Sequence, residues 1–301
     1  MEEKNINLPV LTIESGDIVE HNYDKKEEVW HQIQNAYISK RILSGVLSGV
    51  ENTENGSIAV VYYKDFRVVI PVNEMMLNLS DNSGYGDLKT RQLRILNHML
   101  GCELDFIILG IDNKEKSVVA SRKKAMEAKR KKFFLSEENP MITKDRIVQA
   151  RIIAVAEKVV RIEVFGVECS VPAKNLSWEW IGDAREKFFV GDVVLVHITN
   201  VEINSETDIY IEADMKSVTK NEVLEKLDRC KIQGKYSGKI TDIYKGIIFI
   251  KLDIGVNAIA HTCTDRRIPG NHDDITFVVN RLDKENGVAV GIITRIIRQN
   301  I

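Results

Sequence analysis

The sequence predicts a mainly β protein of three tandem five-stranded units, with an N-terminal helix and helical connectors. Short runs rich in β-branched and aromatic residues, separated by glycines and turn residues, recur along the chain. The same order of elements appears three times, which indicates an internal repeat. The chain has 301 residues, of which 44% are hydrophobic and 29% charged. This composition suffices for two or three small cores and excludes a disordered chain.

The predicted segments follow the recurrence. They are an N-terminal extension with a helix (1–37), a first unit (38–126), a basic helical extension with a linker (127–144), a second unit (145–218), and a third unit with a helical connector (219–301).

The first unit begins after a predicted helix over residues 24–38, where Val29, Trp30 and Ile33 have helical spacing. Lys64 and Asp65 separate two β-rich runs and predict a tight hairpin turn. The predicted strands are 45–50, 58–63, 66–71, 104–109 and 117–121, with a helix over 87–100.

A basic run over residues 121–134 predicts a helix that ends before the linker at Pro140. The second unit then repeats the pattern, with strands at 147–155, 159–164, 169–172, 191–196 and 209–213 and a short helical stretch at 183–187. In the third unit a connector helix over 221–230 precedes strands at 236–240, 246–252, 258–261, 276–279 and 288–291.

The formal net charge of −2 conceals a segregation of charge along the chain. It is −5 for residues 1–37, +2 for 38–126, +2 for 127–144, −5 for 145–218 and +4 for 219–301. The first and third units are therefore the ones that could attract a phosphate backbone. Ordinary variation of a solvated surface is the alternative explanation.

Several motifs occur in order. The third unit carries Gly-Lys-Ile-Thr-Asp-Ile-Tyr-Lys-Gly-Ile-Ile-Phe-Ile-Lys-Leu at 238–252 and Gly-Val-Asn-Ala-Ile-Ala-His at 255–261. The first unit has a similar late strand and exit at 110–112 and 118–123, and the second has the strand entry Gly-Asp-Val-Val at 191–194. On these motifs the chain resembles the S1 RNA-binding domain family, in particular tandem-repeat proteins of the bacterial ribosomal protein S1 type.

The resemblance implies three five-stranded OB-fold barrels that bind single-stranded RNA without catalysis, by base stacking and phosphate contacts. Single-stranded DNA stays open as an alternative ligand. The resemblance also implies a link to translation or RNA metabolism, with the ribosome or RNA-processing machinery as partner. No cofactor and no metal are expected.

The candidate RNA-binding residues fall into three groups. By the resemblance, Phe249 is the stacking residue and His261 the strand-end histidine. Phe249 could instead be a core residue of a small barrel, and His261 with Cys263 could suggest a metal site, but a hydrogen-bonding histidine on the RNA face is favoured. The other candidates in the third unit are Tyr244, Lys245, Lys239, Arg266, Arg267 and Arg281. The candidates in the first unit are Tyr63, Phe66 and Arg67 at the hairpin, and Arg122 and Lys123 in the basic run, which could equally be a solvated helix face.

Departures from the family pattern restrict these expectations. Pro71 and Pro172 stand at the strand-end histidine position of the first and second units, and Arg161 stands at the phenylalanine position of the second. We therefore expect the third unit to supply most of the stacking. Trp178 and Trp180 could stack bases, but they lie in the acidic unit and are expected to cap the second barrel.

Other classes of protein receive little support from the sequence. No apolar stretch has the length of a membrane span, and the first residues are acidic, so we expect a cytoplasmic protein. The four cysteines are scattered and are expected to be small buried hydrophobes. Enzyme motifs are absent, which makes a nuclease a remote alternative. A protein-interaction scaffold that docks through its acidic segments on a ribosomal or polymerase subunit is the closer alternative.

Overall fold

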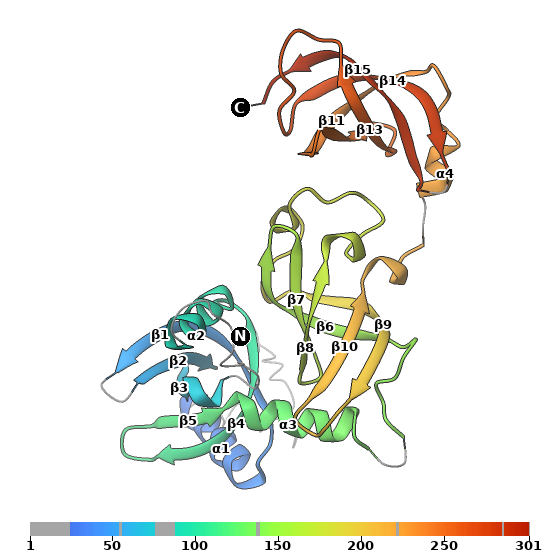
Figure 1. The fold of residues 1–301 in the computed structure, drawn as a ribbon. Helices are drawn as coiled ribbons and strands as arrows, with labels where there is room; N and C mark the ends of the chain where they lie inside the picture. Colours follow the sequence, from blue (N-terminus) through green and yellow to red (C-terminus); the bar gives the residue numbers. More distant parts are fainter. Residues whose placement is uncertain are drawn as a thin grey trace, which may run out of the picture.

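A computed structural model describes residues 25–53, 56–75, 88–136, 139–220, 223–284 and 286–300. In these residues the chain forms three β units arranged in series, with the second unit between the first and the third (Figure 1). The prediction of a mainly β chain with three five-stranded units and an N-terminal helix is confirmed.

The first unit is a closed barrel with strand order β1-β2-β3-β5-β4. Its strands are β1 (Leu43–Thr53), β2 (Gly56–Tyr63), β3 (Phe66–Pro71), β4 (Glu103–Asp112) and β5 (Ser117–Ser121). Lys64 and Asp65 have φ angles of 44° and 71° and form the predicted turn between β2 and β3. The helical elements are α1 (Lys25–Ser39), α2 (Leu88–His98) and the 3-10 turn η2 (Val72–Glu74).

The second unit is a five-stranded sheet with strand order β10-β9-β6-β7-β8. Its strands are β6 (Ile147–Ala156), β7 (Val159–Val164), β8 (Val167–Pro172), β9 (Val193–Ile203) and β10 (Ile209–Asp214). The predicted five strands are present here, but unlike the first unit this sheet is not closed by hydrogen bonds, because β8 and β10 form no hydrogen-bonded ladder. The two strands come within 8 Å of each other between Cα atoms and meet through side chains of one core, including Val171 and Ile211.

The third unit is again a closed barrel, with strand order β11-β12-β13-β15-β14 and a parallel pair β13–β15. Its strands are β11 (Lys235–Tyr244), β12 (Ile247–Leu252), β13 (Asn257–Cys263), β14 (Asp274–Asp283) and β15 (Val288–Arg298). The short helix α4 (Val223–Leu227) precedes the barrel, and the 3-10 turns η3 (Ala173–Asn175), η4 (Ala184–Glu186) and η5 (Lys216–Val218) belong to the second unit.

The helix α3 (Arg122–Phe133) joins the first and second units (Figure 1). It follows β5 directly, with Ser121 as N-cap, so the expected boundary between residues 126 and 127 lies inside it. Arg130 donates from Nε to the carbonyl of Gly166 at 2.7 Å and is buried. The side chain of Ile153, on β6, is buried in the core of the first unit. The two units therefore share apolar and polar contacts along α3 and β6.

Three of the four cysteines are buried as expected: Cys102, Cys169 and Cys230, whereas Cys263 is only half-buried. Burial raises the pKa of the Cys102 and Cys169 thiols to about 12. These thiols are therefore uncharged at neutral pH, as expected for residues that serve as small hydrophobes. None of the helices in the described part of the chain combines the length and the apolar character that a bilayer span requires.

Candidate nucleic-acid interface

A cleft of about 780 Å³ lies between the second and third units. Four aromatic side chains line it, two from each unit: Trp178, Trp180, Tyr244 and Phe249. Lysines of the second unit, Lys158 and Lys174, line the same cleft. Aromatic rings beside basic groups are the combination that binds single-stranded nucleic acid.

Local hydrogen bonds hold the tryptophan segment that follows η3. The hydroxyl of Ser177 accepts from the backbone N–H of Glu179 at 3.0 Å. Trp178 is half-buried, and its indole N–H donates to the carbonyl of Thr219 at 3.0 Å. The ammonium group of Lys216 lies 5.2 Å from the centroid of the Trp178 ring. Trp178 is therefore fixed in the cleft wall.

Trp180 extends across the interface between the second and third units, called the seam below, and covers Phe249. The two ring centroids are 3.7 Å apart and the planes are inclined by 55°. Phe249 is 8% exposed, whereas Trp180 is 36% exposed. The expectation that Trp178 and Trp180 both cap the second barrel is wrong for Trp180, because its ring partner belongs to the third unit. The stacking role of Phe249 stays a prediction, and in this arrangement its ring is covered.

Tyr244 is the most open aromatic side chain of the cleft, at 59% exposed. It ends β11 just before the Lys245-Gly246 turn, in which both residues have positive φ angles, 49° and 78°. The ammonium group of Lys245 lies 5.2 Å from the centroid of the Tyr244 ring. Tyr244 and Lys245, both predicted candidates, thus lie together at the cleft.

Ion pairs connect the two walls of the cleft. Lys158 of the second unit pairs with Asp242 of the third at 2.6 Å, with side chains 47% and 21% exposed. Glu179 pairs with Lys251 of the third unit and with Lys187 of its own unit. The ammonium groups of Lys251 and Lys187 hold the pKa of the Glu179 carboxyl at about 2. The seam is therefore held by charges that persist at neutral pH.

The remaining candidates of the third unit lie outside the aromatic cleft. His261, Arg266 and Arg281 are exposed. Arg267 pairs with Asp265 and also donates to the carbonyl of Ile296, so it fastens its own loop to β15. Lys239 is exposed on β11 and borders a second, smaller hollow at the same seam.

The aromatic candidates of the first unit mostly serve its core. Tyr63 packs edge-on against Phe106, with ring centroids 6.5 Å apart, and Phe66 packs on Trp30 at 5.5 Å. The outward aromatic side chain of the hairpin is Tyr62, which is 46% exposed.

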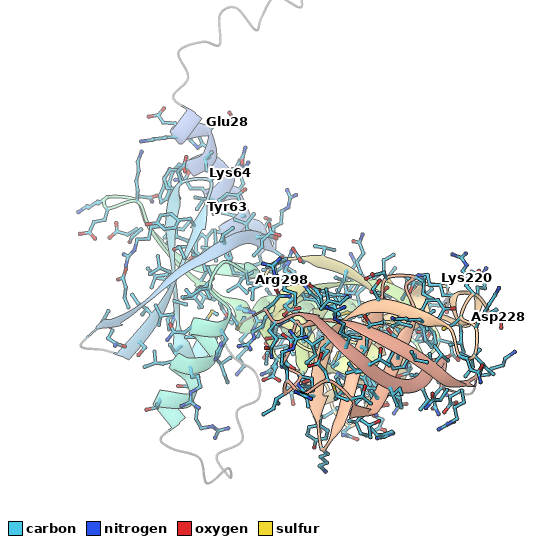
Figure 2. All side chains as sticks on the ribbon, turned by 90° about the horizontal axis from the view of Figure 1, so that it is seen from above. Glu28, Tyr63, Lys64, Lys220, Asp228 and Arg298 are labelled. Atoms are coloured by element: carbon cyan, nitrogen blue, oxygen red, sulfur yellow. The ribbon has the colours of Figure 1, made fainter. Side chains whose placement is uncertain are left out.

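The remaining hairpin candidate, Arg67, pairs with Glu51 at 2.6 Å. Figure 2 shows Tyr63 and Lys64 far from Lys220 and Asp228 at the start of the third unit. The hairpin candidates therefore do not join the aromatic cleft.

The prediction that Arg122 contacts RNA is wrong. Its side chain is 1% exposed and pairs with Glu163 at 2.5 Å and with Glu168 at 2.8 Å. Both carboxylates belong to the second unit, so the guanidinium group forms part of the contact between the first two units and is not available to RNA. Lys123, the next residue of α3, is half-buried.

Sequence reasoning missed two lysines, Lys158 and Lys174, and favoured a capping role for the tryptophans over base stacking. The signal for the tryptophans was present in Ser177-Trp178-Glu179-Trp180, since two tryptophans so close together in a polar segment are unusual for a core strand. Among the described residues, no group of three or more His, Cys, Asp or Glu side chains is placed to hold a metal ion.

A protein-family model matches the second unit of this chain. Residues 142–211 match the family model described as S1 RNA binding domain. The small ribosomal subunit protein bS1 of Coxiella burnetii is 21% identical over 241 residues, which cover 79% of this chain and 39% of that protein. The protein of the same name from Mycolicibacterium smegmatis is 23% identical over 175 residues, covering 58% of this chain and 36% of that protein. The chain thus spans well under half the length of these relatives.

Two solved structures show weaker likeness. A complex of a/eIF2alpha, aDim2p and rRNA from Pyrococcus horikoshii has a TM-score of 0.24 and 13% identity, covering 29% of this chain and 56% of that one. A multidomain protein with nucleic acid binding domains from Streptococcus pneumoniae has a TM-score of 0.20 and 11% identity, covering 85% and 74%. These TM-scores are too low to establish a shared overall fold.

The matched segment is the second unit, whereas the motifs had singled out the third. It runs from Ile142 through β6, β7, β8 and β9 into β10, and it includes the tryptophan segment of the cleft. Residues 142–211 of this chain are therefore similar to the S1 RNA-binding domain family.

Proposed function

We propose that the protein binds single-stranded RNA without catalysis, in the cleft between its second and third units. The proposal rests on one observation: a single cleft of about 780 Å³ is lined by four aromatic residues, Trp178, Trp180, Tyr244 and Phe249. Every base has a π-face, so rings placed in this way bind bases without demanding a particular sequence.

The exposed rings are the ones a base can reach. Tyr244 is open, and Trp180 has a free side because its partner Phe249 covers only one. Phe249 then acts as a support for Trp180 rather than as the primary stacking surface. Lys245 beside Tyr244, together with Lys174, supplies positive charge for the backbone phosphates.

Comparison with known proteins supports the proposal at a coarser level. Residues 142–211 of the second unit match the model of an RNA-binding domain family, and the curated relatives are named as small ribosomal subunit proteins. We propose, on this basis, that all three units are OB-type barrels and that the protein acts in the cytoplasm in translation or RNA metabolism. The parallel pairs β3–β5 and β13–β15, which close the first and third units in the same way, support the repeat.

The test is fluorescence anisotropy of the intact protein with a labelled single-stranded RNA of about 12 nucleotides, measured across a salt series. Trp180→Ala and Tyr244→Ala are each expected to weaken binding by about 1–3 kcal/mol, the usual contribution of one stacked base. Tyr210→Ala is the matched control, because Tyr210 is an exposed aromatic residue of the second unit, with an exposure between those of Trp180 and Tyr244, and lies outside the cleft.

Two outcomes would overturn the proposal. Equal affinities of all three variants would exclude the cleft as the binding surface. Absence of RNA binding at low salt would exclude the nucleic-acid function of the protein alone and would favour the alternative of a protein-interaction scaffold.

A further inference from the structure

A second hollow, of about 290 Å³, lies on the seam between the second and third units. Three consecutive residues, Glu179, Trp180 and Ile181, line both this hollow and the aromatic cleft. The two spaces are therefore neighbours that meet at Trp180. The backbone of an RNA strand whose base stacks on Trp180 can therefore reach the second hollow.

The second hollow is lined by basic and acidic side chains. Lys187, Lys239, Lys251 and His272 line it, together with the carboxylates of Glu179, Asp183 and Glu186. The aromatic cleft and this hollow thus differ in chemistry: four aromatic rings line the first, whereas Trp180 is the one tryptophan, tyrosine or phenylalanine among the described residues that lines the second.

Each carboxylate of the second hollow already has a basic partner. Glu179 pairs with Lys187 and Lys251. Asp183 pairs with Arg185 at 2.6 Å, and the carboxylate of Glu186 lies 3.6 Å from the imidazole of His272.

Among the described residues no ion pair or hydrogen bond joins the ammonium group of Lys239 to another side chain. Lys239 lies on β11, paired across the ladder with Lys251 on one side and Asp274 on the other. Its exposed charge is therefore available to an anion, whereas the other lysines of the hollow are engaged.

We propose that this hollow is a phosphate subsite, in which Lys239 binds a backbone phosphate of the RNA whose base stacks at Trp180. This inference rests on the proposed function and assigns one charge contact within it. A lysine ammonium group is a compact point charge suited to a phosphate oxygen. An RNA bound in this way would cross the seam. Its base would lie in the aromatic cleft, and its phosphate would lie in the second hollow, on the other side of Trp180.

The test compares Lys239→Gln with Lys235→Gln in the intact protein, using the same labelled RNA and salt series. Lys235 is exposed on the same strand and side as Lys239 but borders neither hollow, so both variants lose the same charge. Loss of one phosphate contact lowers the slope of log affinity against log salt by about 0.7 for single strands. Lys239→Gln should show this reduction, and Lys235→Gln should keep the parent slope.

The outcomes separate the two proposals. If Lys239→Gln and Lys235→Gln behave alike, the subsite is refuted, since only net charge would then matter. If, in addition, Trp180→Ala and Tyr244→Ala still weaken binding, the proposed function stands without the subsite. If those aromatic variants bind as the parent does, the proposed function itself fails.

Discussion

The rings of Trp180 and Phe249 lie 3.7 Å apart between centroids, although 69 positions separate the two residues in the sequence and they belong to different units. This contact places a tryptophan of the acidic second unit over the phenylalanine that the family resemblance marks for base stacking. The RNA-binding surface that we propose is thus built jointly by two units.

Replacing Phe249 tests whether it supports Trp180 or stacks on a base itself. In Phe249→Leu the indole of Trp180 loses its ring partner and becomes more exposed to solvent. Its fluorescence emission should therefore shift to longer wavelength. RNA affinity should fall by less than in Trp180→Ala. Phe189→Leu, which alters an exposed phenylalanine of the second unit, is the control. A loss of affinity as large as that of Trp180→Ala, with unchanged emission, would instead assign the stacking to Phe249.

The seam also depends on a glycine. A Cβ atom at Gly182 would lie 2.3 Å from the carbonyl oxygen of Thr241 in the third unit. Gly182→Ala should therefore push the two units apart and weaken RNA binding, while each unit stays folded by circular dichroism. Gly110→Ala is the control, because a Cβ there meets no atom within 4 Å. Parent-like RNA binding by Gly182→Ala would show that the seam does not shape the site.

The sequence could predict the strands but not this interface. The bounds of β5 and β7 were predicted to the residue, because strand patterning and turn residues are local signals. Trp180 and Arg122 were assigned other roles, since their partners lie 69 and 41 positions further along the chain. Such contacts follow from the docking of units, and no periodicity in one segment encodes them.

Arg122 should matter for stability rather than for RNA. It is buried between the first two units with Glu163, so its removal leaves a buried carboxylate without its counter-charge. Arg122→Met should lower the free energy of unfolding by about 3–5 kcal/mol. Lys124→Met, at an exposed position of α3, should leave it nearly unchanged. Urea unfolding measures both, and equal values for the two variants would contradict the prediction.

The same buried cluster predicts a loss of stability in acid. Burial opposes ionisation of Glu168, yet Arg122 and Arg161 outweigh it and lower the pKa of the carboxyl below its usual value. A carboxyl whose pKa is lowered by folding stabilises the protein above its unfolded pKa, near 4.3, and this contribution disappears as pH falls through the folded pKa. The ion pairs of Glu168 should therefore be fully effective at neutral pH and be lost in acid.

Glu168→Gln isolates this contribution because it keeps the size of the side chain and removes its charge. The variant should unfold at lower urea concentration than the parent at pH 7. The difference between the two proteins should shrink as pH falls from about 5 toward 2, since the parent then becomes protonated as well. A difference that stays constant across this range would mean that the charge of Glu168 contributes nothing and that its ion pair with Arg122 is balanced by the cost of burial.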